Sequence, residues 1–201
     1  EHLRRAQEGI QVTAMTAEPM TVAGQHARCD ELAAAVLAYC EERHFKIAAA
    51  ESLTGGLLAD AFVRIPGASK VFLGSVVTYD IRAKSSILGV DDVLLAREGA
   101  EHPEVARGMA EAAEYLNAQP EDGDCVVGWS NTGVAGPGPD GGKPAGLAYV
   151  GVSMPDGFGN VRCRRTKVIE LRLQGTREQV RMTVVQRVLQ NLSSLSPISQ
   201  E

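Results

Sequence analysis

The chain has 201 residues, enough for one domain with a full hydrophobic core, and its 44% apolar content excludes global disorder. Its formal net charge of −5 disfavours broad nucleic-acid binding, which needs a positive field. No apolar run approaches the roughly 20 residues of a membrane span, so we expect no membrane partner.

Cysteine and histidine spacing gives no indication of a metal site. The four cysteines form no C-x-x-C pair, and no histidine lies at zinc-ligand spacing from them. No secretory signal is visible at the N-terminus. We therefore predict no bound metal and a reduced, cytoplasmic setting.

Apolar periodicity and turn residues divide the chain into helices and strands. Residues 1–24 have weak periodicity and are expected to form a flexible arm or part of a leading helix. Asp30, Asp80 and one of Asp91 and Asp92 are predicted helix caps. We expect helices over residues 31–44, 57–65, 81–88, 92–97, 103–117 and 175–192, and strands over residues 46–50, 71–79, 124–131, 147–154 and 161–171.

The order of these elements predicts the fold class. Helices alternate with strands in the first half, and a hairpin and a closing helix follow. This order is typical of an α/β fold, here a three-layer α/β/α sandwich with a mixed sheet. No linker or internal repeat divides it, so we expect one domain over residues 25–195 and a frayed tail over residues 196–201.

The stretch over residues 50–56 (AESLTGG) joins a short apolar strand to an amphipathic helix. Such a junction exposes the Ser52 hydroxyl and directs unpaired helix N–H groups at a ligand. Two interpretations remain open from these residues alone. Ser52 and Thr54 are ordinary helix caps in one, and Ser52 is a nucleophile in the other.

Two further features are predicted to reach the same end of the sheet, where ligand sites of open α/β sheets lie. Tyr79 and Lys84 follow a strand, and residues 132–146 form a glycine- and proline-rich loop. A desolvated lysine can replace histidine as the base for a serine, with Tyr79 relaying a proton or orienting the lysine. The N–H groups around Thr54 and Gly55 would then stabilise an oxyanion, by roughly 3 kcal/mol per donor.

Several motifs in the same order resemble the CinA C-terminal-domain family. They cover residues 50–56 (AESLTGG), 74–79 (GSVVTY), 83–84 (AK), 88–90 (LGV), 132–137 (TGVAGP), 140–146 (DGGKPAG) and 175–181 (GTREQVR). The resemblance extends over about residues 30–192.

This resemblance implies a nicotinamide-nucleotide amidase that hydrolyses nicotinamide mononucleotide to nicotinate mononucleotide and ammonia. The family's nucleophilic serine corresponds to Ser52, its tyrosine to Tyr79 and its lysine to Lys84, and Arg177 would clamp the phosphate. The family is usually oligomeric, which predicts a homo-oligomer, and needs no metal or organic cofactor. The substrate is a small nucleotide, and the residues expected to bind it are Thr54, Gly55, Gly56, Thr132, Gly133, Ala135, Gly136 and Arg177.

The sequence departs from the family pattern at three places. Glu101 and His102 stand where the family tends to have valine and serine, residues 128–131 (GWSN) are bulkier and more polar than the usual strand end, and Gly138 with Pro139 reshapes the loop. A changed substrate preference or a loss of activity would follow if the Glu101–His102 turn faces the pocket. The alternatives are therefore a non-catalytic nucleotide-binding or regulatory domain, and an amidase for another small carboxamide.

Overall fold

The structure, a computed structural model, describes residues 10–13, 21–155 and 164–193. Its centre is a six-stranded sheet with the order β1-β6-β5-β4-β2-β3. The strands are β1 (Ile10–Thr13), β2 (Lys46–Glu51), β3 (Phe72–Val77), β4 (Val126–Gly133), β5 (Leu147–Pro155) and β6 (Arg164–Arg172). The pairs β1/β6, β2/β3 and β2/β4 are parallel, and β4/β5 and β5/β6 are antiparallel. The predicted mixed sheet is therefore confirmed.

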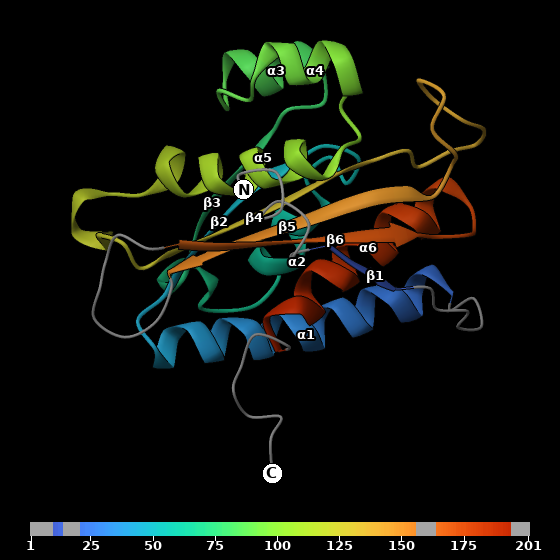
Figure 1. Cartoon of the computed structure of the whole chain (residues 1–201). Helices are drawn as coiled ribbons and strands as arrows, with labels where there is room; N and C mark the ends of the chain where they lie inside the picture. Colours follow the sequence, from blue (N-terminus) through green and yellow to red (C-terminus); the bar gives the residue numbers. More distant parts are fainter. Residues whose placement is uncertain (1–9, 14–20, 156–163, 194–201) are drawn as a thin grey trace.

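Helices cover both faces of this sheet, which confirms the predicted three-layer fold (Figure 1). On one face lie α1 (Val22–Glu42), α2 (Leu57–Val63) and α6 (Arg177–Ser193), and on the other lies α5 (Pro103–Asn117). The short helices α3 (Ile81–Ser86) and α4 (Asp92–Glu98) stand at the outer side of α5. Two 3₁₀ turns, η2 (Ala68–Lys70) and η3 (Pro120–Asp122), complete the fold.

The central strand β2 is built from small residues. Ala48, Ala49 and Ala50 are all fully buried, which matches a parallel strand covered on both faces. The larger apolar side chains come from its neighbours, with Phe62 of α2 and Trp129 of β4 in one core cluster and Met109 of α5 in the other. The carboxyl end of β2 therefore leads into the Ser52 turn from a fixed position in the middle of the sheet.

The N-terminal part of the fold differs from the prediction. Helix α1 begins at Val22 and is capped by Thr21, whose Oγ1 accepts the Gly24 N–H at 3.2 Å, so Asp30 lies inside the helix instead of capping it. The extra turns are fixed by tertiary contacts, since the buried Gln25 side chain donates to Thr183 Oγ1 at 2.8 Å. Weak local periodicity could not reveal such a contact.

Residues 10–13 also differ from the expected arm over residues 1–24, because they form β1 and pair in parallel with residues 168–171 of β6 at the sheet edge. The rest of that arm, the expected turn after Pro155 and the expected tail over residues 196–201 lie outside the described residues.

Strand ends near the site shift by one or two residues. Strand β3 ends at Val77, so Thr78 and Tyr79 belong to the link before α3. Thr132 and Gly133 lie in β4 instead of the loop that follows it. The cap of α3 by Asp80, the cap of α4 by Asp91 and the start of α5 at Pro103 are confirmed.

Candidate active site

Ser52 lies directly after β2, in a tight turn that leads to α2. Gly55 has φ +57° and Gly56 has φ +97°, backbone conformations that favour glycine. The Gly55 N–H donates to the Ser52 carbonyl at 3.1 Å and closes the turn. Only 6% of the Ser52 surface is exposed, so the residue is buried at the carboxyl end of β2.

Lys84 extends from α3 to this serine. Its Nζ lies 2.9 Å from Ser52 Oγ and donates to the Thr78 carbonyl at 2.6 Å. The lysine is fully buried, and this burial lowers its pKa to about 8, while the carboxylates of Glu101 and Asp80 act in the opposite direction. The structure thus brings together the two side chains that the sequence analysis named as nucleophile and base.

The Glu51 carboxylate occupies the N-terminus of α2, a role that the sequence analysis did not foresee. Glu51 is fully buried. It accepts the N–H groups of Gly56, Leu58 and Ala59 at 2.9–3.1 Å. The hydroxyls of Thr54 and Ser75 donate to it at 2.7 and 2.9 Å. An acidic residue directly after a run of four apolar residues in β2 was the available signal.

This network corrects the expected oxyanion site. The Gly55 N–H is used by the Ser52 carbonyl, and the Thr54 N–H lies 3.5 Å from Asn131 Oδ1. The helix N-terminus is already neutralised by Glu51, so it does not supply free donors. The Leu53 N–H makes no hydrogen bond within the described residues, and it directly follows the candidate nucleophile. That is the usual position for an oxyanion donor in serine hydrolases.

Asn131 and Arg181 hold the turn from two other elements. Asn131, fully buried in β4, accepts the Ser52 N–H at 3.3 Å, and its Oδ1 lies 2.9 Å from the oxygen of the Thr54 hydroxyl that donates to Glu51. From α6, Arg181 donates to the carbonyls of Leu53 and Thr54 at 2.8 and 2.7 Å. Strand and helix thus fix the backbone on both sides of the candidate nucleophile.

Two buried polar atoms around the Ser52–Lys84 pair have no partner among the described residues. They are Thr78 Oγ1, on the residue whose carbonyl holds Lys84, and Asn131 Nδ2, on the residue that holds the Ser52 turn. Buried polar atoms are normally hydrogen-bonded. Both atoms therefore keep unused hydrogen-bonding capacity beside the Ser52–Lys84 pair.

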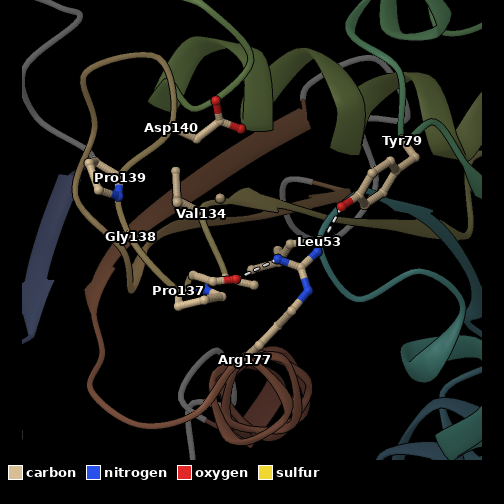
Figure 2. A pocket seen from close by; sticks show the side chains of 11 residues that line it. Leu53, Tyr79, Val134, Pro137, Gly138, Pro139, Asp140 and Arg177 are labelled. Atoms are coloured by element: carbon tan, nitrogen blue, oxygen red, sulfur yellow. Dashed lines mark hydrogen bonds between the residues drawn. The ribbon is translucent and has the colours of Figure 1, made fainter.

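A pocket of about 220 Å³ opens beside this turn. Residues 133–140 form one wall, and Leu53, Tyr79 and Arg177 complete it (Figure 2). The Arg177 guanidinium connects the loop to Tyr79. It donates to the Gly136 carbonyl at 2.7 Å and to the Tyr79 hydroxyl at 2.8 Å. Asp140 lies on the loop away from Arg177.

The predicted substrate residues divide into two groups. Gly133, Ala135, Gly136 and Arg177 line the pocket, as does Tyr79. Thr54, Gly55, Gly56 and Thr132 are not among its lining residues, and Thr132 instead donates its hydroxyl to the Ala100 carbonyl at 2.9 Å. Leu53, which the sequence analysis did not name, lines the pocket in their place. The Tyr79 hydroxyl contacts Arg177 at the pocket, and within the described residues it makes no hydrogen bond to Ser52 or to Lys84, the lysine that it was expected to orient.

The departures from the family pattern have structural roles. His102 caps α5, because its Nδ1 accepts the Glu104 N–H at 3.3 Å, and partial burial lowers its pKa below 6.5. Trp129 packs against Phe62, with ring centroids 5.5 Å apart. The Ser130 hydroxyl donates to the Ala106 carbonyl at 2.6 Å. The Glu101 carboxylate raises the pKa of Lys84, so this turn does act on the site.

Within the described residues, no three histidine, cysteine, aspartate or glutamate side chains gather in a way that could hold a metal ion. In the same part of the chain, no helix combines the length and the apolar character needed to cross a bilayer.

Comparisons with known proteins agree with the fold and the motifs. The family model described as "CinA C-terminal domain" matches residues 29–196. A CinA-like protein of Frankia casuarinae is 40% identical over 157 residues, which cover 78% of this chain and 33% of that protein. A CinA-like protein of Acidobacterium capsulatum is 38% identical over 157 residues, covering 77% and 34%. The chain thus spans about a third of the length of these relatives.

Among solved structures, the competence/damage inducible protein CihA of Agrobacterium tumefaciens superposes with a TM-score of 0.73 at 29% identity. The match covers 90% of this chain and 99% of that one. A CinA superfamily protein of Escherichia coli gives a TM-score of 0.71 at 27% identity, covering 91% and 95%. The sheet and helix layers described above are thus shared with these proteins.

Proposed function

Since the chain belongs to the CinA C-terminal domain family, we propose that it is an amidohydrolase that deamidates nicotinamide mononucleotide by a serine–lysine mechanism. The observation that carries this proposal is the buried contact of 2.9 Å between Lys84 Nζ and Ser52 Oγ. A serine needs a base to become a nucleophile, and a lysine serves as one when burial lowers its pKa, as it does here.

The proposed reaction begins with neutral Lys84. Its lone pair takes the proton of the Ser52 hydroxyl while the Oγ attacks the carboxamide carbon. The negative charge that develops on the carboxamide oxygen is stabilised by the Leu53 N–H, the donor left free by the turn. Lys84 then returns the proton to the leaving nitrogen, the C–N bond breaks, and ammonia departs.

The acyl-enzyme that remains is an ester of Ser52. A water molecule, deprotonated by Lys84, attacks its carbonyl carbon, and the bond to Ser52 Oγ breaks as the proton returns to the serine. The product is nicotinate mononucleotide. Because Lys84 is held by the Thr78 carbonyl at 2.6 Å, its Nζ remains in place for both steps.

Arg177 supports the choice of a nucleotide as substrate. Its guanidinium lies in the pocket, and a planar guanidinium suits the geometry of a phosphate. Two neutral groups hold it there, the Gly136 carbonyl and the Tyr79 hydroxyl, so its positive charge is not cancelled by either contact. We propose that the substrate phosphate binds this charge and that the Tyr79 hydroxyl also contacts the substrate.

Ammonia release from nicotinamide mononucleotide by the purified chain tests the proposal. Ser52→Ala is expected to lose at least about a hundredfold in kcat, because the nucleophile is gone. The matched control is Ser69→Ala, which changes an exposed serine in η2 and should retain full activity. Equal activity in the Ser52→Ala variant would exclude Ser52 as the nucleophile.

The Glu101 carboxylate favours a second candidate, a non-catalytic nucleotide-binding domain. By raising the pKa of Lys84 it decreases the neutral fraction that catalysis needs. Calorimetric binding of nicotinamide mononucleotide, with no ammonia released over hours, would support this candidate. A panel of other small carboxamides with the same ammonia readout tests the remaining alternative, an amidase with a different substrate.

We also propose that the chain forms a homo-oligomer through the β3 edge and α3–α4. Strand β3 ends the sheet, and Val77, Ile81, Ile87 and Val93 on or next to these elements are 39–68% exposed. An apolar edge of this kind is normally covered in a stable protein. Light scattering after size exclusion tests this, and a monomer at micromolar concentration would contradict it.

A further inference from the structure

We propose that Lys143 is a positioning residue that ties the loop over the pocket to the turn between α4 and α5, and thereby holds the pocket wall in place for the substrate. The inference rests on the proposed function for the identity of that substrate. The contacts themselves are independent of it.

One end of this tie is the C-terminus of α4. Lys143 Nζ donates to the carbonyl of Glu98, the last residue of α4, at 2.7 Å, and also to the carbonyl of Glu101. The last carbonyls of a helix have no partner within the helix, and a cation is favoured there. Gly99, with φ +78°, turns the chain away so that both carbonyls can face one ammonium.

The other end is the turn that carries Asp140. The Asp140 N–H donates to the Lys143 carbonyl at 3.0 Å, and the Lys143 N–H donates to the Asp140 carbonyl at 2.8 Å. Asp140 and the three residues before it line the pocket. A displacement of Lys143 would therefore be passed directly to that wall.

The loop has few other ties to the fold. Within the described part of the chain, Lys143 alone connects residues 137–145 by hydrogen bonds to an element that is not their sequence neighbour. At the start of the loop, Arg177 holds the Gly136 carbonyl at 2.7 Å. Lys143 thus fixes the far side of the wall, as Arg177 fixes the near side.

The turn between α4 and α5, which Lys143 binds, is itself fixed relative to Ser52. Thr132 in β4 donates its hydroxyl to the Ala100 carbonyl, between the two carbonyls that Lys143 binds. The preceding residue, Asn131, accepts the Ser52 N–H. The pocket wall is therefore positioned relative to Ser52 through Lys143, the turn after α4 and the end of β4.

Three variants test the inference. Lys143→Met retains the aliphatic stem but cannot donate to the two carbonyls. Lys143→Arg retains donors that can bind both. Lys70→Met is the matched control, because Lys70 is an exposed lysine that pairs with Glu41 at 2.8 Å on the α1 side of the fold.

We expect Lys143→Met to raise KM for nicotinamide mononucleotide about tenfold while kcat stays within about threefold, since Ser52 and Lys84 are untouched. Amide hydrogen exchange should accelerate in residues 134–146 and 98–102 and remain unchanged in residues 46–56. Lys143→Arg should recover at least half of the lost affinity. Lys70→Met should match the parent protein in every measurement.

Unchanged exchange in the loop together with an unchanged KM would overturn the inference. Faster exchange throughout the chain, residues 46–56 included, would also overturn it, because it indicates a general loss of stability. If the parent protein releases no ammonia, the proposed reaction fails, and the inference is still tested by loop exchange and by the Kd for the nucleotide from calorimetry.

Discussion

The pH dependence of ammonia release should reveal the state of Lys84. Burial lowers the pKa of this lysine from 10.5 to about 8. At pH 7 a base with a pKa of 8 is about 10% neutral, whereas an ordinary lysine would be only about 0.03% neutral. Burial therefore increases the reactive fraction roughly 300-fold at neutral pH.

We expect kcat/KM to rise with pH, about tenfold between pH 6 and 7, and to level off above about pH 9, because this parameter reports the pKa of groups in the free enzyme. His102 does not account for this rise, because burial lowers its pKa below 6.5 and its titration therefore comes at lower pH. The assay is ammonia release at substrate concentrations well below KM.

Two variants assign the rise to Lys84. Lys84→Arg keeps the positive charge and removes the base, since a guanidinium stays protonated, and should lose at least about a hundredfold. Glu101→Gln removes a carboxylate that raises the pKa of Lys84, so the midpoint should move to lower pH. A profile that is flat from pH 6 to 9, or an active Lys84→Arg protein, would refute the assignment of Lys84 as the base.

Three further predictions concern the surroundings of the pair. Glu51→Gln places an amide NH₂ among five donors and should lower the free energy of unfolding by roughly 3 kcal/mol; urea denaturation showing less than about 1 kcal/mol would contradict the network described here. Arg177→Lys cannot bind a phosphate in two places and should raise KM for nicotinamide mononucleotide about tenfold, but not for the riboside that lacks the phosphate. An equal change for both compounds would remove Arg177 from the phosphate. Gly133→Ala would place a Cβ 2.6 Å from the Ala148 backbone, so the free energy of unfolding should fall by about 2 kcal/mol. An unchanged melting temperature would contradict this close packing of β4 against β5.

Features that depend on local sequence were predictable. Pro103 at the first helical position fixed the start of α5, and Asp80 and Asp91 marked the caps of α3 and α4. The stretch over residues 50–56 was predicted to join a strand to a helix, and the structure places it between β2 and α2. Ser52 and Lys84 were named from motifs, although neither residue by itself distinguishes a catalytic group from a cap or a solvated side chain.

Features that depend on distant partners were not predictable. Asn131 is hydrogen-bonded to Ser52, which lies 79 residues away in the sequence, and Arg181 to Leu53, which lies 128 residues away. A polar residue in a buried strand was a signal that Asn131 has a partner, but it could not identify that partner. The early start of α1 has the same origin, because Gln25 is placed by its contact with α6.

The lowered pKa of Lys84 also has a consequence for stability. A lysine with a pKa of about 8 in the folded state and 10.5 in the unfolded state binds its proton more weakly when folded. Folding is therefore less favourable by about 3 kcal/mol below pH 8, and the penalty disappears as the pH rises from about 8 to 10.5.

Lys84 therefore needs a rigid surrounding that offsets this penalty at neutral pH. The network of Glu51, Asn131 and Arg181 has that character, because it satisfies the backbone of the Ser52 turn from three different elements. The same network explains why the N–H groups at the helix N-terminus are not free to bind an oxyanion. These N–H groups stabilise the fold through Glu51, which leaves the Leu53 N–H for the proposed chemistry.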